Sequence, residues 1–270
     1  MRALFLFALL TIILRAESDD PGMKGPGLKI ELIAETASVT PGKPLTMGVQ
    51  IKHFPGFHTY WKNPGMVGME TSLKWKLPKG FTASEIHWPA PENTFMGQYP
   101  CHGYERDVTL LVTITPPESL SGNSVTLSTE AGWMCCAKGC FPGFQTLSLT
   151  LPVRDKPVPA PNHAKLIARA KKDLPSNDHG LTATLLSKVD APVIHIHFTS
   201  KSELPQKDLY FFSTDRQISS DQVQNFEPQP DGSLILNVAR SEFSPEEKTS
   251  LPGVLRIGKA YYSLVAQPRR

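Results

Sequence analysis

The sequence predicts an all-β protein with two immunoglobulin-like β-sandwich domains, joined by a proline-rich linker and one short helix. Three observations predict this fold class. Short apolar runs alternate apolar with polar residues, which is typical of strands that have one face in a core. The 25 prolines and 19 glycines are scattered between these runs, as turn residues are. Hydrophobic residues make up 40% of the chain, which is enough for a core in each domain.

The start of the chain predicts export from the cytoplasm. An apolar run at residues 3–14 precedes Ala16 and Ser18, which have the small-x-small pattern of a signal peptidase site. We therefore expect a signal peptide at residues 1–18 and a flexible N-terminal segment at residues 19–27. The apolar run is short for a bilayer, and an uncleaved membrane anchor is the alternative. The mature protein is expected to be soluble, and periplasmic or secreted.

The first domain is predicted at residues 28–154, because about seven short strands with turns between them are typical of an immunoglobulin-like sandwich. The predicted strands cover residues 28–39, 45–54, 72–77, 84–88, 107–114, 125–133 and 147–153. In the run at 107–114 the even-numbered residues form the apolar face. In the runs at 125–133 and 147–153 the odd-numbered residues form it.

The second domain is predicted at residues 164–270, after a linker at 155–163 whose alternating prolines favour an extended, stiff chain. A helix is expected at 164–174, where apolar residues have helical spacing until Pro175 ends it. The predicted strands that follow cover residues 181–189, 193–198, 209–212, 234–238 and 254–265.

Charge and motifs exclude several classes of function. The formal net charge of +3 is too small for a nucleic-acid surface. We find no Ser-His-Asp arrangement, phosphate loop or paired-carboxylate motif, so a hydrolase or a kinase is not expected. His195 and His197 share the outward face of one predicted strand, which we interpret as a solvated face without a third metal ligand. All four cysteines and all four tryptophans lie in the first predicted domain, so chemistry is expected there.

Three cysteines lie close together between Trp133 and Pro142. Strand parity continues from the inward Trp133, so it places Cys135 inward and Cys136 outward. A hairpin turn at 137–139 then returns Cys140 to the outward side. We predict that Cys136 and Cys140 lie on one exposed face, where opposed hairpin residues come close enough for a disulfide. A bridge that closes so small a loop adds little stability, which favours a redox switch over a structural bond.

The other two cysteines, Cys101 and Cys135, are the candidates for a structural disulfide. A bond between them closes a long loop and therefore stabilises the fold more. Four cysteines nevertheless allow three pairings, and two structural disulfides without a redox function are the alternative. Lys138 and His102 are candidates for lowering the pKa of a nearby thiol.

Several segments of the first predicted domain carry a resemblance to a known family. They are residues 58–65 (HTYWKNPG), 88–92 (WPAPE) and 103–105 (GYE), then Trp133 with Cys136, Cys140 and Pro142, and residues 149–153 (LTLPV). In this order they resemble the N-terminal periplasmic domain of the thiol:disulfide interchange protein DsbD, especially the variant found in the copper-sensitivity suppressor ScsB. The second predicted domain is similar to the second β domain of the ScsB-like branch, at residues 210–212 and 253–255.

The resemblance implies an immunoglobulin-like fold and a catalytic pair, Cys136 and Cys140, that cycles between disulfide and dithiol. It implies electron transfer from a membrane-embedded thiol reductase of DsbD type to periplasmic thioredoxin-like or disulfide isomerase proteins, as in cytochrome c biogenesis and copper tolerance. Each step is a thiolate attack through a mixed disulfide, without a cofactor. The segment 54–61 is expected to form part of a cap over the pair, although core packing is the favoured alternative for Trp61, Trp75 and Trp133.

Departures from the family leave other hypotheses open. Cys135 lies beside the expected pair, so Cys135 with Cys140 is an alternative reactive couple. The membrane and thioredoxin-like domains of the family are not recognised in this sequence, so a separate membrane partner is expected, and loss of electron transfer is the alternative. A Cu(I) site at Cys101, His102 and Met96 is a second alternative, because thiolate, imidazole and thioether ligands suit Cu(I). A non-catalytic interaction module with structural disulfides is a third, and its disulfides would resist mild reductant.

Overall fold

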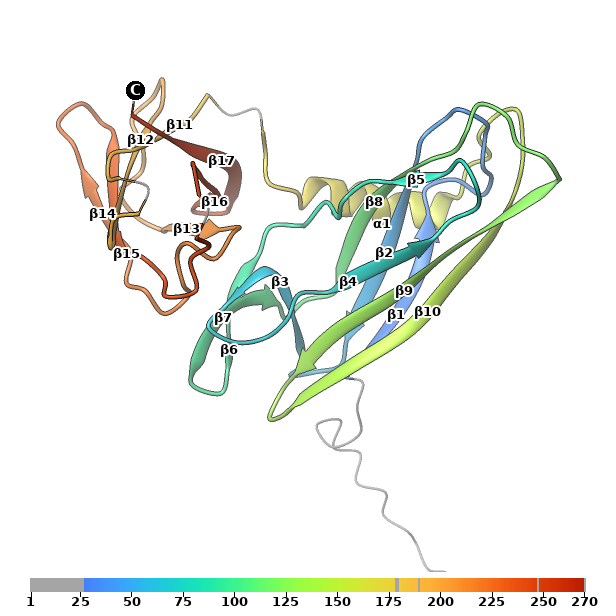
Figure 1. Ribbon diagram of the computed structural model, residues 1–270, viewed down its shortest axis with the longest axis horizontal. Helices are drawn as coiled ribbons and strands as arrows, with labels where there is room; N and C mark the ends of the chain where they lie inside the picture. The colour runs from blue at the N-terminus through green and yellow to red at the C-terminus, as the bar shows by residue number, and fades with distance from the viewer. Residues whose placement is uncertain (1–26, 178–179, 189, 247, 270) are drawn as a thin grey trace, which may run out of the picture.

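The computed structural model describes residues 27–177, 180–188, 190–246 and 248–269, and the expected signal peptide lies outside them. Within these ranges the chain forms seventeen strands and one helix, so the protein is all-β as predicted. Figure 1 shows an elongated molecule in which β1 to β10 and α1 form one body and β11 to β17 form another. We call these bodies the N-terminal part and the C-terminal part. No helix in the described ranges is both long enough and apolar enough to span a bilayer.

The N-terminal part is a sandwich of two antiparallel sheets. The four-stranded sheet has the order β1 (Leu28–Ala34), β2 (Leu45–His53), β8 (Val108–Thr115), β5 (Thr82–Ala83). The six-stranded sheet has the order β10 (Cys140–Pro152), β9 (Ser124–Cys136), β3 (His58–Gly65), β7 (Tyr99–Tyr104), β6 (Glu92–Met96), and β4 (Ser72–Lys76) also pairs with β9. Apolar side chains from both sheets, including Met47, Ile51, Leu127 and Trp133, fill one core between them.

Most strands with a clear alternation lie where the sequence predicts them, and the exceptions have physical reasons. Residues 84–88 form no strand and contribute only a bridge between His87 and Leu111. The strands β3, β5, β6 and β7 were not predicted. Both faces of β3 are largely buried, so its sequence does not alternate. In β7, Pro100 argues against a strand, and the strand carries few apolar residues.

The helix α1 (Pro161–Lys172) packs on the N-terminal part, although its position in the sequence assigned it to the second predicted domain. Its buried residues Ile167 and Ala170 contact Ile33 and Leu111, which point out of the four-stranded sheet on the side away from the main core. An apolar stripe on a helix is stable only where it covers such a surface. The segment before it also pairs with this part, since the Ala37 amide donates to the Val158 carbonyl at 2.8 Å.

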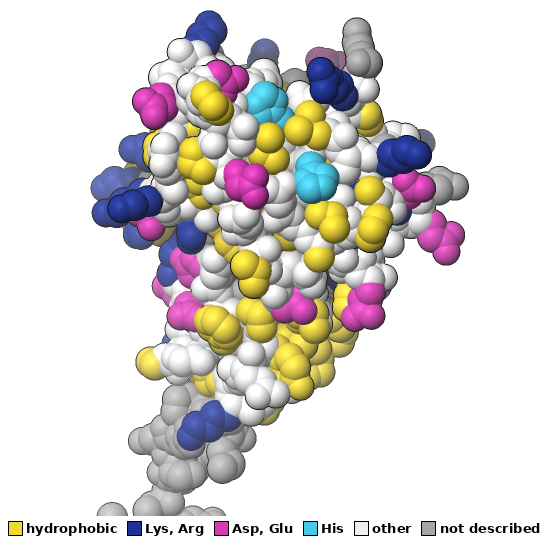
Figure 2. Space-filling view, turned by 90° about the vertical axis from the view of Figure 1, so that its left-hand side faces the viewer, with side chains coloured by type: hydrophobic (Ala, Val, Ile, Leu, Met, Phe, Trp, Pro, Cys, Tyr) yellow, Lys and Arg dark blue, Asp and Glu magenta, His cyan; other side chains and the backbone are white. Residues whose placement is uncertain are grey.

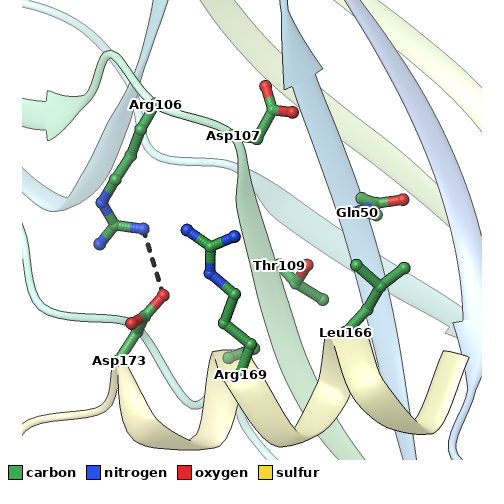
Figure 3. Close-up of a pocket in the computed structure, with 8 residues that line it drawn as sticks. Gln50, Arg106, Asp107, Thr109, Leu166, Arg169 and Asp173 are labelled. Atoms are coloured by element: carbon green, nitrogen blue, oxygen red, sulfur yellow. Dashed lines mark hydrogen bonds and ion pairs between the residues drawn. The ribbon is translucent and has the colours of Figure 1, made fainter. Parts of the chain in front are cut away.

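A cavity of about 250 Å³ lies between α1 and the sheet that it covers (Figure 3). Arg106 and Arg169 face it together with the carboxylates of Asp107 and Asp173, and Arg106 is paired with Asp173. No cysteine lines this cavity. The cavity is therefore separate from the chemistry that the sequence predicts.

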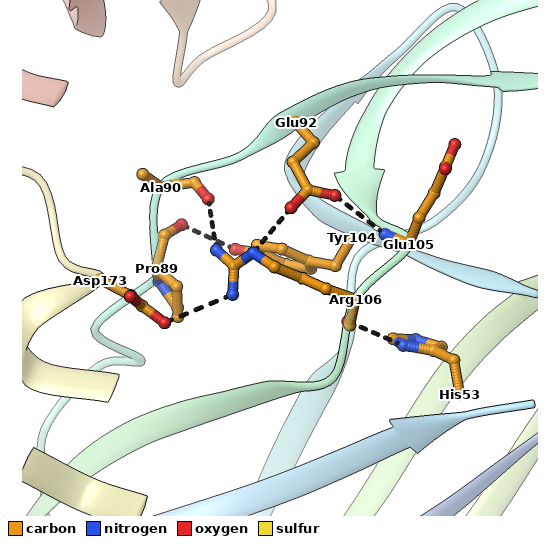
Figure 4. A network of polar contacts seen from close by, with 8 residues as sticks. All are labelled: His53, Pro89, Ala90, Glu92, Tyr104, Glu105, Arg106 and Asp173. Carbon is orange, nitrogen blue, oxygen red and sulfur yellow. Dashed lines mark hydrogen bonds and ion pairs between the residues drawn. The ribbon is translucent and has the colours of Figure 1, made fainter. Parts of the chain in front are cut away.

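Arg106 follows the end of β7 and joins it to the segment at the start of β6 and to the end of α1 (Figure 4). Its guanidinium donates to Glu92 at 2.6 Å, to Asp173 at 3.3 Å and to the Ala90 carbonyl at 3.4 Å. Nearby, the buried Tyr104 hydroxyl donates to the Pro89 carbonyl at 2.8 Å. These contacts fix β7 relative to β6 and the end of α1.

The C-terminal part is a single curled sheet with its own core. Its strand order is β13 (Leu209–Ser213), β16 (Leu251–Ile257), β17 (Ala260–Pro268), β11 (Thr182–Leu185), β12 (Val193–Thr199), β15 (Leu234–Ala239), β14 (Asn225–Pro228). The predicted run at 254–265 is in fact the hairpin of β16 and β17, which turns at Gly258. His195 and His197 point to the same side of β12, where each ring bonds its own neighbour, Asn237 and Ser233 respectively.

The two parts meet where β13 and β16 lie against β3 and β7. Phe212 and Val254 of the C-terminal part belong to the core cluster of the N-terminal part. The rings of Phe212 and Trp61 are 6.1 Å apart, and the buried Asn63 side chain donates to the Ser213 carbonyl at 2.6 Å. The contact is both apolar and hydrogen-bonded, so the C-terminal part has a defined position on β3 and β7.

Candidate redox site

The predicted cysteine hairpin is present at the end of β9 and β10. Cys140 lies directly opposite Cys136, and the two form a disulfide with a Cα–Cα distance of 4.2 Å. The turn between them is closed by the Ala137 amide, which donates to the Gly139 carbonyl at 2.9 Å. The pairing of β9 with β10 thus places the two sulfurs next to each other.

The two halves of this disulfide differ in exposure, and the prediction that both lie on an exposed face is wrong for Cys136. Cys140 is exposed, whereas Cys136 is 0% exposed. Cys136 packs in a small cluster with Tyr60 and Cys101 on the side of the sheet away from the main core, and we call this the outer cluster. Val67, Met96 and Met134 cover this cluster. Cys136 does point to the outward side of the strand, as parity predicts. That side is buried here, because loops fold over this end of the sheet.

The expected structural bond between Cys101 and Cys135 is not formed, and both are buried free cysteines. Cys135 faces the main core beside Trp133, as parity predicts, while Cys101 belongs to the outer cluster with Cys136. A sheet therefore separates the two side chains. Cys135 is likewise not the partner of Cys140. Burial raises the pKa of Cys101 and of Cys135 to about 12, so both stay protonated at neutral pH.

Two side chains of β3 lie beside the disulfide, and both belong to the segment 54–61 that the sequence predicts to form part of a cap. His58 is paired directly with Cys136 across the β3–β9 ladder, and its Nε2 lies 3.3 Å from the Tyr60 hydroxyl. Burial lowers the pKa of His58, and the Glu105 carboxylate opposes this shift. Burial also raises the pKa of Tyr60, with smaller effects from Cys101 and Cys135. The buried sulfur therefore has neutral, polarisable neighbours.

The structure does not bring together the three residues of the alternative copper site. Cys101 and Met96 belong to the outer cluster, but His102 faces the C-terminal part. Its Nδ1 lies 3.3 Å from the Asn63 carbonyl and its Nε2 lies 2.9 Å from the Tyr210 hydroxyl, so both ring nitrogens are engaged. Burial lowers the pKa of His102 to about 4. Within the described ranges, no three His, Cys, Asp or Glu side chains gather as metal ligands.

The segment expected to cap the disulfide is mostly core. Phe57 is buried and contacts the ring of Phe141 at 6.0 Å, and Trp61 and Trp133 are buried in the main core. Core packing, the alternative for the tryptophans, is therefore confirmed, with Trp75 partly buried against the same core. Of this segment, Tyr60 packs on Cys136 and His58 pairs with it across the ladder. The rest of the cover comes from Val67, from Met96 of the β6–β7 hairpin and from Met134 of β9.

Apolar side chains are exposed next to this cover. Phe95 and Tyr99 of the β6–β7 hairpin are 61% and 48% exposed, and Met69 is 60% exposed. Figure 2 shows hydrophobic side chains gathered on the lower part of this face, below the C-terminal part. Exposed apolar residues that gather in this way are typical of interaction surfaces.

Comparison with known proteins decides the family of the N-terminal part. Residues 31–152 match the family model described as "Thiol:disulfide interchange protein DsbD, N-terminal". The N-terminal part contains a DsbD N-terminal-type domain. The matched residues of this DsbD-type domain include all four cysteines and the whole of the hairpin up to Pro152.

Solved structures agree with this fold over most of the chain. The N-terminal periplasmic domain of ScsB from Proteus mirabilis superposes with a TM-score of 0.67 at 12% identity, covering 91% of this chain and 95% of that one. Both parts therefore have the ScsB-like fold. The Escherichia coli adhesin FdeC and titin A168169 are also found, but their TM-scores of 0.23 and 0.21 carry no argument. No curated protein gives a significant match.

Proposed function

We propose that this chain is a thiol–disulfide exchange protein that acts through Cys136 and Cys140. The observation that supports this most is the short-loop disulfide at the hairpin end of a DsbD-type domain, with one sulfur exposed and the other buried. A bond that closes so small a loop contributes little to folding stability. An exposed sulfur in such a bond is open to attack by a thiolate.

The difference in exposure suggests an order of events. The thiolate of a reduced partner bonds to the Cys140 sulfur, the Cys136–Cys140 bond breaks, and Cys136 leaves with the electron pair and takes up a proton. The second thiolate of the partner then attacks the mixed disulfide and releases Cys140, so the partner is oxidised and this protein is reduced by two electrons. With an oxidised client the steps run in reverse, and Cys136 resolves the mixed disulfide.

The proposed partners follow the family. A membrane-embedded thiol reductase of DsbD type supplies the electrons, and thioredoxin-like or disulfide isomerase proteins of the periplasm receive them. The exposed apolar side chains of the β6–β7 hairpin offer a docking surface next to the cover of Cys136. Because exchange requires close approach of two sulfurs, a surface next to the disulfide is where a partner must bind.

The test is a redox titration of the folded protein in a glutathione or dithiothreitol series, with free thiols trapped and mapped by mass spectrometry. We expect Cys136 and Cys140 to become reduced together at a mild potential while the protein stays folded. If the disulfide resists until the protein unfolds, it is structural, and the non-catalytic interaction module is the better description.

A further inference from the structure

The loop between β13 and β14 of the C-terminal part reaches across to the segments that cover Cys136. Ser220 in this loop accepts a hydrogen bond from the Met66 amide at 3.0 Å and donates one to the Pro100 carbonyl. Met66 follows the end of β3, and Pro100 lies near the start of β7. One hydroxyl therefore joins two strands of the sheet from outside it.

Both joined segments continue into the cover of Cys136. Val67, next to Met66, and Cys101, next to Pro100, belong to the outer cluster that contains Cys136. A Cβ built on Gly68 would lie 2.2 Å from the Tyr60 ring, so the 66–70 loop rests directly on that ring. Movement of this loop would therefore uncover Tyr60 first and the Cys136 sulfur beneath it.

The approach of Ser220 is close and the local backbone accommodates it. Gly65 has a φ of +84°, and a Cβ built there would lie 2.1 Å from the Ser220 hydroxyl oxygen. The Gly65 amide donates to the Asn63 side chain at 3.1 Å, and Asn63 in turn donates to the Ser213 carbonyl. The end of β3 is thus shaped to receive the C-terminal part.

The C-terminal part also contacts the other end of the 66–70 loop. Arg216 forms an ion pair with Glu70 at 3.7 Å. Arg216 has a φ of 65°, a left-handed conformation that non-glycine residues seldom adopt. Such backbone strain persists where the surrounding structure imposes it, and it gathers at functional sites. The two contacts, at Met66 and at Glu70, bracket the loop.

We propose that Ser220, assisted by Arg216, is a positioning residue of the redox site: it holds the cover closed over Cys136 so that exchange begins at Cys140. The role in exchange rests on the proposed function, whereas the closure of the cover over Cys136 can be measured independently of it. Through Ser220 the C-terminal part would direct the reaction, because an incoming thiolate can attack only the unprotected sulfur of the disulfide, that of Cys140. The class of reaction is unchanged, and no cofactor is needed.

The test compares Ser220→Ala with Ser219→Ala. Ser219 is a matched control, because its hydroxyl is buried next to Ser220 in the chain and has no hydrogen-bond partner. Each folded variant is fully reduced with excess reductant, and the alkylation rates of Cys136 and Cys140 are measured by fragment-ion mass spectrometry. Loss of the bridging hydroxyl should raise the rate at Cys136 about fivefold or more, with Cys140 unchanged. Ser219→Ala should leave the ratio of the two rates as in the wild type.

A merely structural Ser220 would lower the melting temperature without changing this ratio, and that result overturns the proposal. Arg216→Ala is the second variant, since its side chain is 48% exposed and its loss does not threaten folding. It should raise the Cys136 rate in the same direction, and unchanged rates in both variants also overturn the proposal. Reduction of the wild type at mild potential is measured separately. Failure there contradicts the exchange function and leaves the closure measurement valid.

Discussion

At the scale of single residues, Cys136 and Cys140 share one bond but have different surroundings. Cys140 is open to solvent, and Cys136 lies beneath Tyr60 and the cover. Thiol–disulfide exchange needs collinear approach to one sulfur, so access decides which sulfur is attacked. The chemistry is therefore set less by the sequence of the hairpin than by what folds over one side of it.

This difference predicts opposite behaviour of two single variants. Cys136→Ser leaves the exposed Cys140 thiol without its resolving partner, so it should accumulate a mixed disulfide when mixed with an oxidised thioredoxin-fold protein. Cys140→Ser should form at least tenfold less, because Cys136 is buried. Non-reducing electrophoresis measures both, with Cys101→Ser as a control that retains the pair. Equal trapping by the two variants would contradict the order of attack.

The two free cysteines lead to a second prediction at this scale. Burial raises the pKa of Cys101 and Cys135 to about 12, so almost no thiolate is present at pH 8. In the native oxidised protein both should react with iodoacetamide at least about a hundredfold more slowly than an exposed thiol. In denaturant without reductant, two thiols per chain should be labelled. Finding none would show that Cys101 and Cys135 are disulfide-bonded after all.

At the scale of elements, strand β7 links several parts of the site. It carries Cys101 on one face and His102 on the other, and Arg106 ties its end to β6 and α1. A partly exposed network that joins three segments contributes more than a single surface ion pair, because each contact holds the others in place.

Arg106→Ala should therefore lower the free energy of unfolding by about 1–2 kcal/mol, from the lost bonds to Glu92, Asp173 and Ala90. Chemical denaturation measures this loss. Lys52→Ala is the control, since it removes one exposed ion pair with Glu31 and should cost about 0.5 kcal/mol or less. Equal effects of the two substitutions would show that the Arg106 network is no more than a surface pair.

At the scale of the whole molecule, the buried contact between the two parts contains a titratable group. His102 is 1% exposed, and its ring packs on Trp61 and Phe212 while it bonds Tyr210 across the contact. Burial lowers its pKa to about 4, against about 6.5 in an unfolded chain. Between these values the unfolded state binds more protons than the folded state.

Stability should therefore be constant above about pH 6.5 and fall as the pH drops towards 4, by about 3 kcal/mol from His102. His53, whose pKa burial also lowers to about 4, contributes with the same sign. His102→Gln should remove only its own share of the pH dependence, which urea denaturation at pH 7.5 and pH 4.5 measures. An unchanged pH slope in this variant would show that folding does not lower the pKa of His102.

The sequence alone was enough for the features that depend on local periodicity. Alternation in residues 107–114 and 125–133 predicts β8 and β9, and the continued parity places Trp133 and Cys135 in the core. The short spacing of Cys136 and Cys140 around a turn places them close enough for a disulfide, and the structure selects this pairing from the three that four cysteines allow. In each case the interacting residues are neighbours along the chain or alternate on one strand, so a short window contains the information.

Only the tertiary structure decided the features that depend on distant segments. It shows that Cys136 is buried, that Cys101 and Cys135 lie on opposite faces of a sheet, and that α1 covers the first sandwich. It also places Ser220 between the ends of β3 and β7. Parity states which face of a strand a residue occupies, but not what covers that face. Loops and a second body of strands, both from distant parts of the sequence, supply that cover. The alternation of residues within one strand therefore cannot predict it.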